Sequence, residues 1–258
     1  MLFDTHAHLY DDKFQYDREE MIADVLKTVE HVVIPGEDRE TGAQALALAE
    51  QYPAFYCAVG VHPHLAAAMT EEDFAQIKTW AQTEKKVVAI GEIGLDYYYD
   101  NSPRDIQQEV FRRFVKLGIE LDLPIIIHDR DAHGDTLRIL QEEAHPRLRG
   151  ILHCYSGSYE MAAELLKLGF YISFSGTVVF PKSTKLKDVA RRLPLDRLLI
   201  ETDSPYLTPP PFRGRRNDPT RVYYVAEELA RLHDMPVEEM IEATSRNAKA
   251  IRNAGVRC

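Results

Sequence analysis

The stretch Leu2-Phe3-Asp4-Thr5-His6-Ala7-His8 places two histidines, two positions apart, directly after a short apolar run. Side chains alternate between the faces of a strand, so His6 and His8 point the same way if the strand continues through them. Two imidazoles on one face at the end of a strand provide half of a metal site. The same order, an apolar run followed by polar residues, recurs along the chain and predicts both the fold and the site.

Eight short apolar runs have the length and composition of buried strands. They are 2–3, 31–34, 55–59, 87–90, 125–127, 150–152, 170–174 and 198–200. The stretches around them predict helices over roughly 17–29, 40–51, 71–84, 103–122, 132–144, 158–168, 184–192, 218–233 and 236–252. Eight strand–helix units favour an α/β fold, a single (β/α)8 TIM-barrel domain over 1–258. The main alternative, a doubly wound open sheet, would carry a glycine-rich first turn that is absent here.

The composition limits the class of protein. A length of 258 residues with 45% hydrophobic residues is enough for a large core. A formal charge of -10 would repel nucleic acid, so a polyanionic substrate needs a local basic surface or a bound metal. Three cysteines without Cys-x-x-Cys spacing favour a reducing, cytoplasmic setting. Asp4 and His6 stand where a signal peptide would be basic and then apolar, and no run has the length of a membrane span. We expect a monomer.

The polar residues that follow the apolar runs predict the site, because active-site residues of a (β/α)8 barrel lie at the C-terminal ends of its strands. Six of the ten histidines fall there, at positions 6, 8, 62, 64, 128 and 153. Glu92 follows the fourth run between Gly91 and Gly94, and Asp203 follows the eighth. The expected metal ligands are His6, His8, Glu92, His128, His153 and Asp203.

Four imidazoles and two carboxylates exceed the ligands of one tetrahedral catalytic ion and suit two divalent ions. One ion is assigned to His6, His8 and Asp203. The other is assigned to His128 and His153, and Glu92 bridges the two. Two ions roughly 3.5–4 Å apart neutralise a phosphate or carbonyl oxygen and lower the pKa of water towards about 7. Zinc, manganese, iron, cobalt or nickel suits these donors, and magnesium fits four imidazoles less well.

Each expected ligand also has a structural alternative. The histidines could hydrogen-bond a strand end or a loop carbonyl, Glu92 could pair with a lysine or arginine, and Asp203 could cap the following turn. Glu201, two positions before Asp203, is expected to orient a ligand. Cys154 follows His153 and is expected to point to the opposite face, into the core.

Other residues near these strand ends are candidates for contact with the substrate. His62 would donate to a phosphate, His64 is as readily structural, and Arg130 would contact an anion or pair with a neighbouring aspartate. Arg213 and Arg215 belong to a basic run that is either a phosphate contact or a solvated loop. Five loop tyrosines either stack on nucleobases or pack within their loops, namely Tyr97, Tyr98, Tyr99, Tyr155 and Tyr206.

Seven motifs, taken together and in order, resemble those of the TatD family of metal-dependent deoxyribonucleases, in the amidohydrolase superfamily. They are Asp4-Thr5-His6-Ala7-His8-Leu9, Gly60-Val61-His62-Pro63-His64, Gly91-Glu92-Ile93-Gly94-Leu95-Asp96-Tyr97, Ile127-His128-Asp129-Arg130-Asp131-Ala132, His153-Cys154-Tyr155-Ser156-Gly157, Glu201-Thr202-Asp203-Ser204-Pro205-Tyr206-Leu207 and Arg213-Gly214-Arg215-Arg216-Asn217-Asp218-Pro219. The resemblance implies a distorted TIM barrel with two metals on the six ligands above.

The resemblance also implies hydrolysis of DNA phosphodiester bonds, with single-stranded DNA or 3′ ends as the substrate and 5′-mononucleotides as the product. Asp203 would orient or deprotonate the attacking water, Glu92 would hold both ions, and His62 would stabilise the charged phosphate oxygens. Two alternatives stay open from the residues alone. One is a related hydrolase acting on an ester, a lactone or D-aminoacyl-tRNA, and the other is a barrel that binds nucleic acid without turnover.

Overall fold

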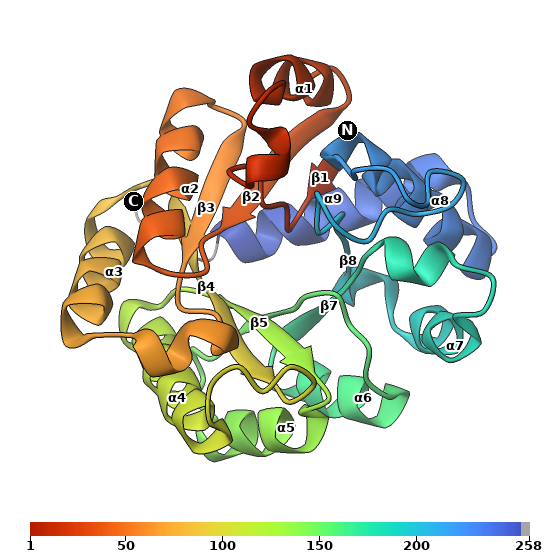
Figure 1. Ribbon diagram of the computed structural model, residues 1–258. Coiled ribbons are helices and arrows are strands. Elements are labelled where there is room, and N and C mark those ends of the chain that lie inside the picture. The colour runs from red at the N-terminus through yellow and green to blue at the C-terminus, as the bar shows by residue number, and fades with distance from the viewer. Residues whose placement is uncertain (254–258) are drawn as a thin grey trace.

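The computed structural model describes residues 1–253, in which a ring of parallel strands is surrounded by helices (Figure 1). The eight strands are β1 (Leu2–Asp4), β2 (Val29–Pro35), β3 (Phe55–Val59), β4 (Val87–Asp96), β5 (Ile125–Arg130), β6 (Gly150–Leu152), β7 (Phe170–Phe174) and β8 (Leu198–Ile200). Each strand pairs in parallel with the next one along the chain. The predicted (β/α)8 barrel is therefore confirmed.

Helices follow the strands at nearly the positions expected from sequence. Within the described residues they are α1 (Arg18–Val25), α2 (Arg39–Gln51), α3 (Glu71–Thr83), α4 (Arg104–Leu121), α5 (His133–Glu142), α6 (Tyr159–Lys167), α7 (Thr184–Arg192), α8 (Val222–Leu232) and α9 (Val237–Asn253). Local chemistry fixes several starts, since Asp38 and Thr70 each form a capping box with the residue three positions on. None of these helices is long and apolar enough to cross a membrane.

Closure of the barrel depends on the segments just beyond β1 and β8. The amide of Asp203 donates to the carbonyl of His6 (2.9 Å), and the amide of His8 donates to the carbonyl of Ser204 (2.8 Å). The backbone bonds that join the first strand to the last therefore also bring His6, His8 and Asp203 side by side.

The interior of the barrel is apolar at one end and polar at the other. At the N-terminal ends of the strands, Ala248 and Ile251 of α9 belong to one buried apolar cluster with residues from seven strands. Those residues are Phe3, Val33, Ala58, Ala89, Ile126, Ile151 and Leu199. Nearer the C-terminal ends, the hydroxyls of Thr5 and Ser173 lie 3.2 Å apart, and Ser173 donates to the carboxylate of Glu201. The C-terminal end therefore offers buried polar groups for a site.

Strand β4 is longer than the sequence suggested, which moves Glu92 from the end of a strand into its middle. The apolar run ends at Ile90, but the ladder between β4 and β5 continues to the pair Asp96–Arg130. Polar side chains at the strand's end do not stop a ladder, because its hydrogen bonds join backbone groups. All ten residues of β4 are buried, so the carboxylate of Glu92 lies deep beneath the mouth.

Gly94 gives the first prediction, because its neighbour His128 is an expected ligand. Its φ is +142°, and a Cβ built there would lie 2.0 Å from the carbonyl oxygen of His128. We expect Gly94→Ala to lower the free energy of unfolding by roughly 3 kcal/mol or more, through strain and a forced shift of β5. Urea unfolding followed by circular dichroism measures this loss.

Gly134, in α5, is the matched control. A Cβ at Gly134 meets nothing within 4 Å, and alanine is preferred to glycine in helices by about 0.8–1.0 kcal/mol. Gly134→Ala should therefore leave the protein equally or slightly more stable. Equal stability of Gly94→Ala and wild type would contradict the close approach of β4 and β5 described here.

Candidate metal centre

The C-terminal ends of the strands surround a cavity of about 660 Å³. Most of the residues expected to form the site line it, namely His8, His62, His64, Glu92, His128, Arg130, His153 and Asp203. His6 lies beneath them and is fully buried. The structure thus brings all six expected ligands to one place, as two groups on either side of Glu92.

The first group contains His6, His8 and Asp203, whose potential ligand atoms lie within 4.8 Å of one another. The Nε2 atoms of His6 and His8 face each other at 3.2 Å. Oδ1 of Asp203 lies 3.3 Å from Nε2 of His8 and 3.7 Å from Nε2 of His6. Asp203 has a φ of +54°, in the left-handed region that aspartate tolerates better than most residues.

The second group lies on β5 and just beyond β6. Nδ1 of His128 and Nε2 of His153 are 3.4 Å apart. The nearby Nε2 of His62 also faces this group. Two further clusters have the size that holds an ion, one of His62, Glu92 and His128 and one of His6, His153 and Glu201. His62 was expected to contact substrate, and the structure places it at the boundary between the second group and the open cavity.

Glu92 joins the two groups through its two oxygen atoms. Oε2 faces the first group, at 3.3 Å from Nε2 of His6 and 3.8 Å from Nε2 of His8. Oε1 faces the second group, at 3.0 Å from Nδ1 of His128 and 2.8 Å from Nε2 of His153. A carboxylate whose oxygens face two separate pairs of imidazoles has the arrangement of a bridging ligand.

The spacing of the first group fits a cation. Bonds of about 2.0–2.2 Å to a tetrahedral ion separate the ligand atoms by roughly 3.3–3.6 Å. The distances among His6, His8, Asp203 and Glu92 are close to this range, at 3.2, 3.3, 3.3, 3.7 and 3.8 Å. Two facing Nε2 atoms and two carboxylate oxygens therefore have the chemistry and the spacing of a divalent-metal site.

The electrostatics of the cluster also favour a cation. Burial alone would lower the pKa of His8, but its hydrogen bond to Asp203 raises that pKa to about 9. Burial would likewise lower the pKa of His153, and the charge of Glu92 instead holds it well above the usual value. Burial would raise the pKa of Glu92, whereas His153 and His6 hold it well below its usual range. The carboxylates thus favour positive charge on the imidazoles of both groups. A bound metal ion would supply this charge in place of the protons.

Further contacts fix the orientation of the imidazoles. Nδ1 of His153 lies 3.3 Å from Oε1 of Glu201, as expected for an orienting carboxylate. Nδ1 of His8 lies 3.0 Å from the hydroxyl of Tyr10, which donates to Oε2 of Glu37 at 3.2 Å. Each ring therefore turns its other nitrogen towards the expected ions.

Sequence reasoning assigned no role to Tyr10, Glu37 or Asp96. Glu37 follows the end of β2 and lines the cavity, so the strand-end rule would have identified it had the second apolar run been included. Tyr10 lies two positions beyond His8, and Asp96 lies four beyond Glu92. In both cases, continuing the alternation of side chains along the strand by one or two pairs of residues would have indicated the residue.

Cys154 contradicts its expected position in the core. It lines the same cavity as His153, and its thiol lies 3.2 Å from the hydroxyl of Ser175. The alternation of side chains fails because β6 ends at Leu152 and Cys154 has a φ of +42°. Burial raises the pKa of this thiol to about 12, so it remains neutral.

The expected substrate contacts separate into two sets. His62 and Arg130 line the cavity, whereas Arg213 and Arg215 are exposed on the segment after β8 and lie outside its lining. The neighbouring Arg216 pairs with Asp17 at 2.6 Å. Contact of Arg213 and Arg215 with substrate stays a prediction.

Asp96 provides a second prediction, because it holds His128 in one orientation. Its Oδ1 accepts from the amides of Tyr98 and Tyr99, and its Oδ2 lies 3.0 Å from Nε2 of His128. In Asp96→Asn, the amides of Tyr98 and Tyr99 keep the side-chain oxygen in the place of Oδ1. The new NH₂ group then takes the place of Oδ2 and faces His128. That ring must then carry its proton on Nδ1, the nitrogen that faces Glu92.

We expect Asp96→Asn to weaken metal binding beside His128 by about 10–100-fold. Metal titration in competition with a chromophoric chelator measures this change. Asp135→Asn, at a carboxylate that bonds Arg138 and Tyr97 outside the cavity, should bind metal like wild type. Wild-type metal affinity in Asp96→Asn would contradict the role assigned to this carboxylate.

The chain is similar to known proteins over its described length. A model of the family described as TatD related DNase matches residues 3–253. A Bacillus subtilis protein named uncharacterized metal-dependent hydrolase YabD is 51% identical over 252 residues, which are 97% of this chain and 98% of that protein. A Cronobacter turicensis protein named 3'-5' ssDNA/RNA exonuclease TatD is 33% identical over 253 residues, 96% of each. The crystal structure of YJJV, a TatD homologue from Escherichia coli, has a TM-score of 0.92 at 33% identity and covers 98% of both chains.

Proposed function

The chain belongs to the family of TatD related DNases and is a metal-dependent hydrolase, and from this premise we propose that it removes nucleotides from the 3′ end of single-stranded DNA. The polarity and the preference for single strands follow the name of the Cronobacter relative. We propose two divalent ions, drawn from zinc, manganese, cobalt, nickel and magnesium. One would be held by His6, His8 and Asp203, the other by His128 and His153, and both by Glu92.

The observation that carries this proposal is the position of Glu92. Its two oxygens face two different pairs of imidazoles at 2.8–3.8 Å. A purely structural metal would be enclosed by four protein ligands and would need no such bridge. The cavity above Glu92 is instead lined by groups that suit an anionic substrate, including His62 and Arg130.

The chain's own residues supply proton transfer and orientation. When bound, the two ions would supply positive charge to the phosphate and lower the pKa of a water molecule. The Asp203 side chain is 16% exposed, against 3% for Glu92. Asp203 is therefore the more exposed of these two carboxylates, and it would accept a proton from the attacking water.

His62 and Arg130 would hold the phosphate. Burial, followed by the charge of His128, keeps the pKa of His62 well below its usual value, so its ring is neutral. Its Nδ1 accepts the amide of His64 at 3.2 Å, which puts the single proton on Nε2. That N–H is available to a phosphate oxygen, and the Arg130 guanidinium adds a charged donor at the cavity rim.

The shape of the site favours a nucleic acid over a small ester, lactone or similar substrate. A small apolar substrate would select a closed apolar pocket. Here the cavity reaches the surface between Tyr99 and Tyr206, which line it and are 54% and 43% exposed. We also infer that the protein acts as a monomer in the cytoplasm, where the free thiols of Cys57 and Cys154 would stay reduced.

A nuclease assay tests this function. A 5′-labelled single-stranded oligonucleotide is incubated with protein stripped of metal and resupplied with magnesium, manganese or zinc. We expect single-nucleotide shortening from the 3′ end only when metal is present, and no shortening of an oligonucleotide with a phosphorothioate 3′ terminus. Metal-loaded protein that leaves every DNA intact would contradict the proposal. Esters, lactones and D-aminoacyl-tRNA would then be the substrates to test.

A further inference from the structure

Two exposed tyrosines flank the metal centre, each beside a different group of expected ligands. The Tyr206 ring meets the His8 ring edge-on at a centroid distance of 6.1 Å. The Tyr99 ring meets the His64 ring edge-on at 5.3 Å, and His64 itself contacts His62 and His128. Both tyrosines line the cavity, so a chain laid across the centre would pass one ring on each side.

Tyr99 is held in place without being buried. Its amide donates to Asp96, the carboxylate that also orients His128. The Arg130 guanidinium lies 4.8 Å from its ring centroid and 4.1 Å from that of Tyr98. Despite these contacts, Tyr99 remains 54% and Tyr98 58% exposed. Fixed aromatic rings beside a cation are the elements of a stacking platform for nucleobases.

Tyr206 has the corresponding arrangement beside the first group. Its hydroxyl donates to Oδ2 of Asp11 at 2.7 Å, and Nζ of Lys13 lies 4.0 Å from its ring centroid. Tyr206 is 43% exposed. Both sides of the centre therefore combine an anchored aromatic ring with a positive charge, in a chain whose net charge is -10.

Packing within loops does not explain these rings, as comparison with the other loop tyrosines shows. Tyr155 is 3% exposed and belongs to the apolar core. The hydroxyl of Tyr97 donates to Asp135, and its ring packs against the core. Loop packing thus accounts for Tyr97 and Tyr155. Tyr98, Tyr99 and Tyr206 remain exposed, and of these Tyr99 and Tyr206 line the cavity.

We propose that Tyr99 and Tyr206 each stack on one nucleobase, on either side of the phosphate that is cleaved, with Arg130 at that phosphate and Lys13 near the next phosphate of the strand. This inference rests on the proposed nuclease function and assigns the residues that would hold the bases of a single strand. Bases in a duplex are stacked on one another and cannot lie against a tyrosine. Recognition by stacking also requires no particular sequence, because every base has an aromatic face.

The test compares an ordinary single-stranded oligonucleotide with one of equal length whose last residues lack bases. On the ordinary substrate, Tyr99→Leu and Tyr206→Leu should each lower kcat/KM by about 5- to 150-fold. On the abasic substrate, both variants should match wild type, since there is no base to stack. Tyr206→Phe keeps the ring and loses only the bond to Asp11, so its kcat/KM on the ordinary substrate should fall less than that of Tyr206→Leu.

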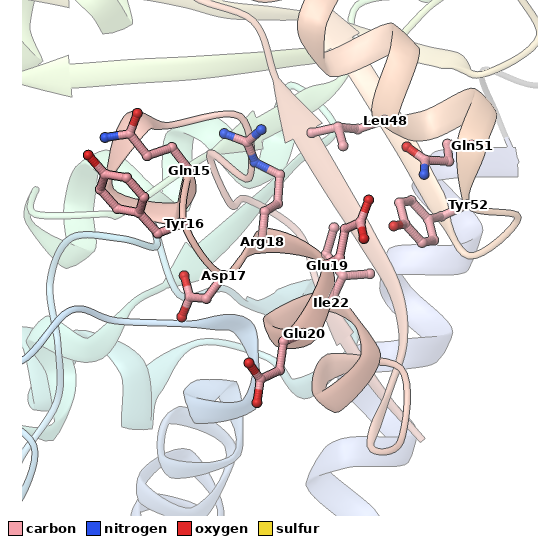
Figure 2. A pocket seen from close by; sticks show the side chains of 10 residues that line it. All are labelled: Gln15, Tyr16, Asp17, Arg18, Glu19, Glu20, Ile22, Leu48, Gln51 and Tyr52. Atoms are coloured by element: carbon pink, nitrogen blue, oxygen red, sulfur yellow. The ribbon is translucent and has the colours of Figure 1, made fainter.

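Tyr16→Leu is the control for the loss of an exposed tyrosine. Tyr16 is 92% exposed and lines a hollow of about 500 Å³ outside the barrel, between the start of α1 and the end of α2 (Figure 2). This variant should cleave both substrates like wild type.

Three outcomes would overturn the inference. The first is an unchanged kcat/KM of both leucine variants on the ordinary substrate. The second is an equal loss on the ordinary and the abasic substrate, which would indicate damage to the centre. In the third, wild type cleaves both substrates equally well. If metal-loaded wild type cleaves neither oligonucleotide nor bis(p-nitrophenyl) phosphate, the proposed function fails as well, and this result is distinct from the other three.

Discussion

We expect replacement of Glu92 by glutamine to lower the rate of DNA hydrolysis by about 10³-fold or more and to leave the protein with fewer than two bound ions. Glu92 is the one expected ligand that faces both groups, through Oε2 on one side and Oε1 on the other. A glutamine keeps the volume but removes the negative charge that holds both ions. Its NH₂ group also turns a donor towards one pair of imidazoles, where an acceptor is required.

Two measurements check this result. Elemental analysis of the dialysed protein counts the ions per chain, and the oligonucleotide assay gives the rate. Glu72→Gln is the control, because Glu72 lies on the surface and pairs only with Arg39 at 2.9 Å. That variant should keep both ions and full activity. Two tightly bound ions in Glu92→Gln would show that Glu92 does not bridge them.

We expect replacement of Asp203 by asparagine to lower the rate of DNA hydrolysis by about 10²–10⁴-fold, the range typical of removing a general base. Asparagine tolerates the left-handed backbone at this position, where φ is +54°. The amide of residue 203 still donates to the carbonyl of His6 and keeps the barrel closed. The change therefore removes the carboxylate beside His8 while the second group stays intact.

Asp234→Asn is a matched control for this substitution. Asp234 also has a left-handed backbone, with a φ of +52°, but follows α8 away from the cavity. It should retain wild-type activity and unfold at the same urea concentration as wild type. Wild-type activity in Asp203→Asn would remove Asp203 from the mechanism.

The sequence was enough to predict the barrel and the residues of its mouth, because buried strands and the residues that follow them each have a recognisable pattern. Buried parallel strands are apolar throughout, so runs such as Ile125-Ile126-Ile127 mark strands with little ambiguity. The barrel then requires that whatever follows each run faces one mouth. This rule alone predicted that His6, His128 and His153, which are far apart in the chain, lie in one site.

Features that depend on the backbone conformation beyond the strand ends could not be predicted from the sequence. The left-handed conformation of Cys154 turns its side chain to the cavity, and nothing in the residue type predicts it. The extent of β4 depends on its pairing with β5, which places Glu92 in mid-strand. The proton on Nε2 of His62 is determined by the position of one amide, that of His64. Such details arise from tertiary geometry and not from local pattern.

The most direct test of the account is anomalous diffraction from crystals soaked in manganese, recorded near the manganese absorption edge. The account predicts two peaks roughly 3.5–4 Å apart, one beside His6, His8 and Asp203 and the other beside His128 and His153. It further predicts that the Glu92 carboxylate lies between them, with one oxygen directed at each. A single peak, or two peaks that do not share Glu92, would contradict the two-metal centre on which the proposed nuclease function depends.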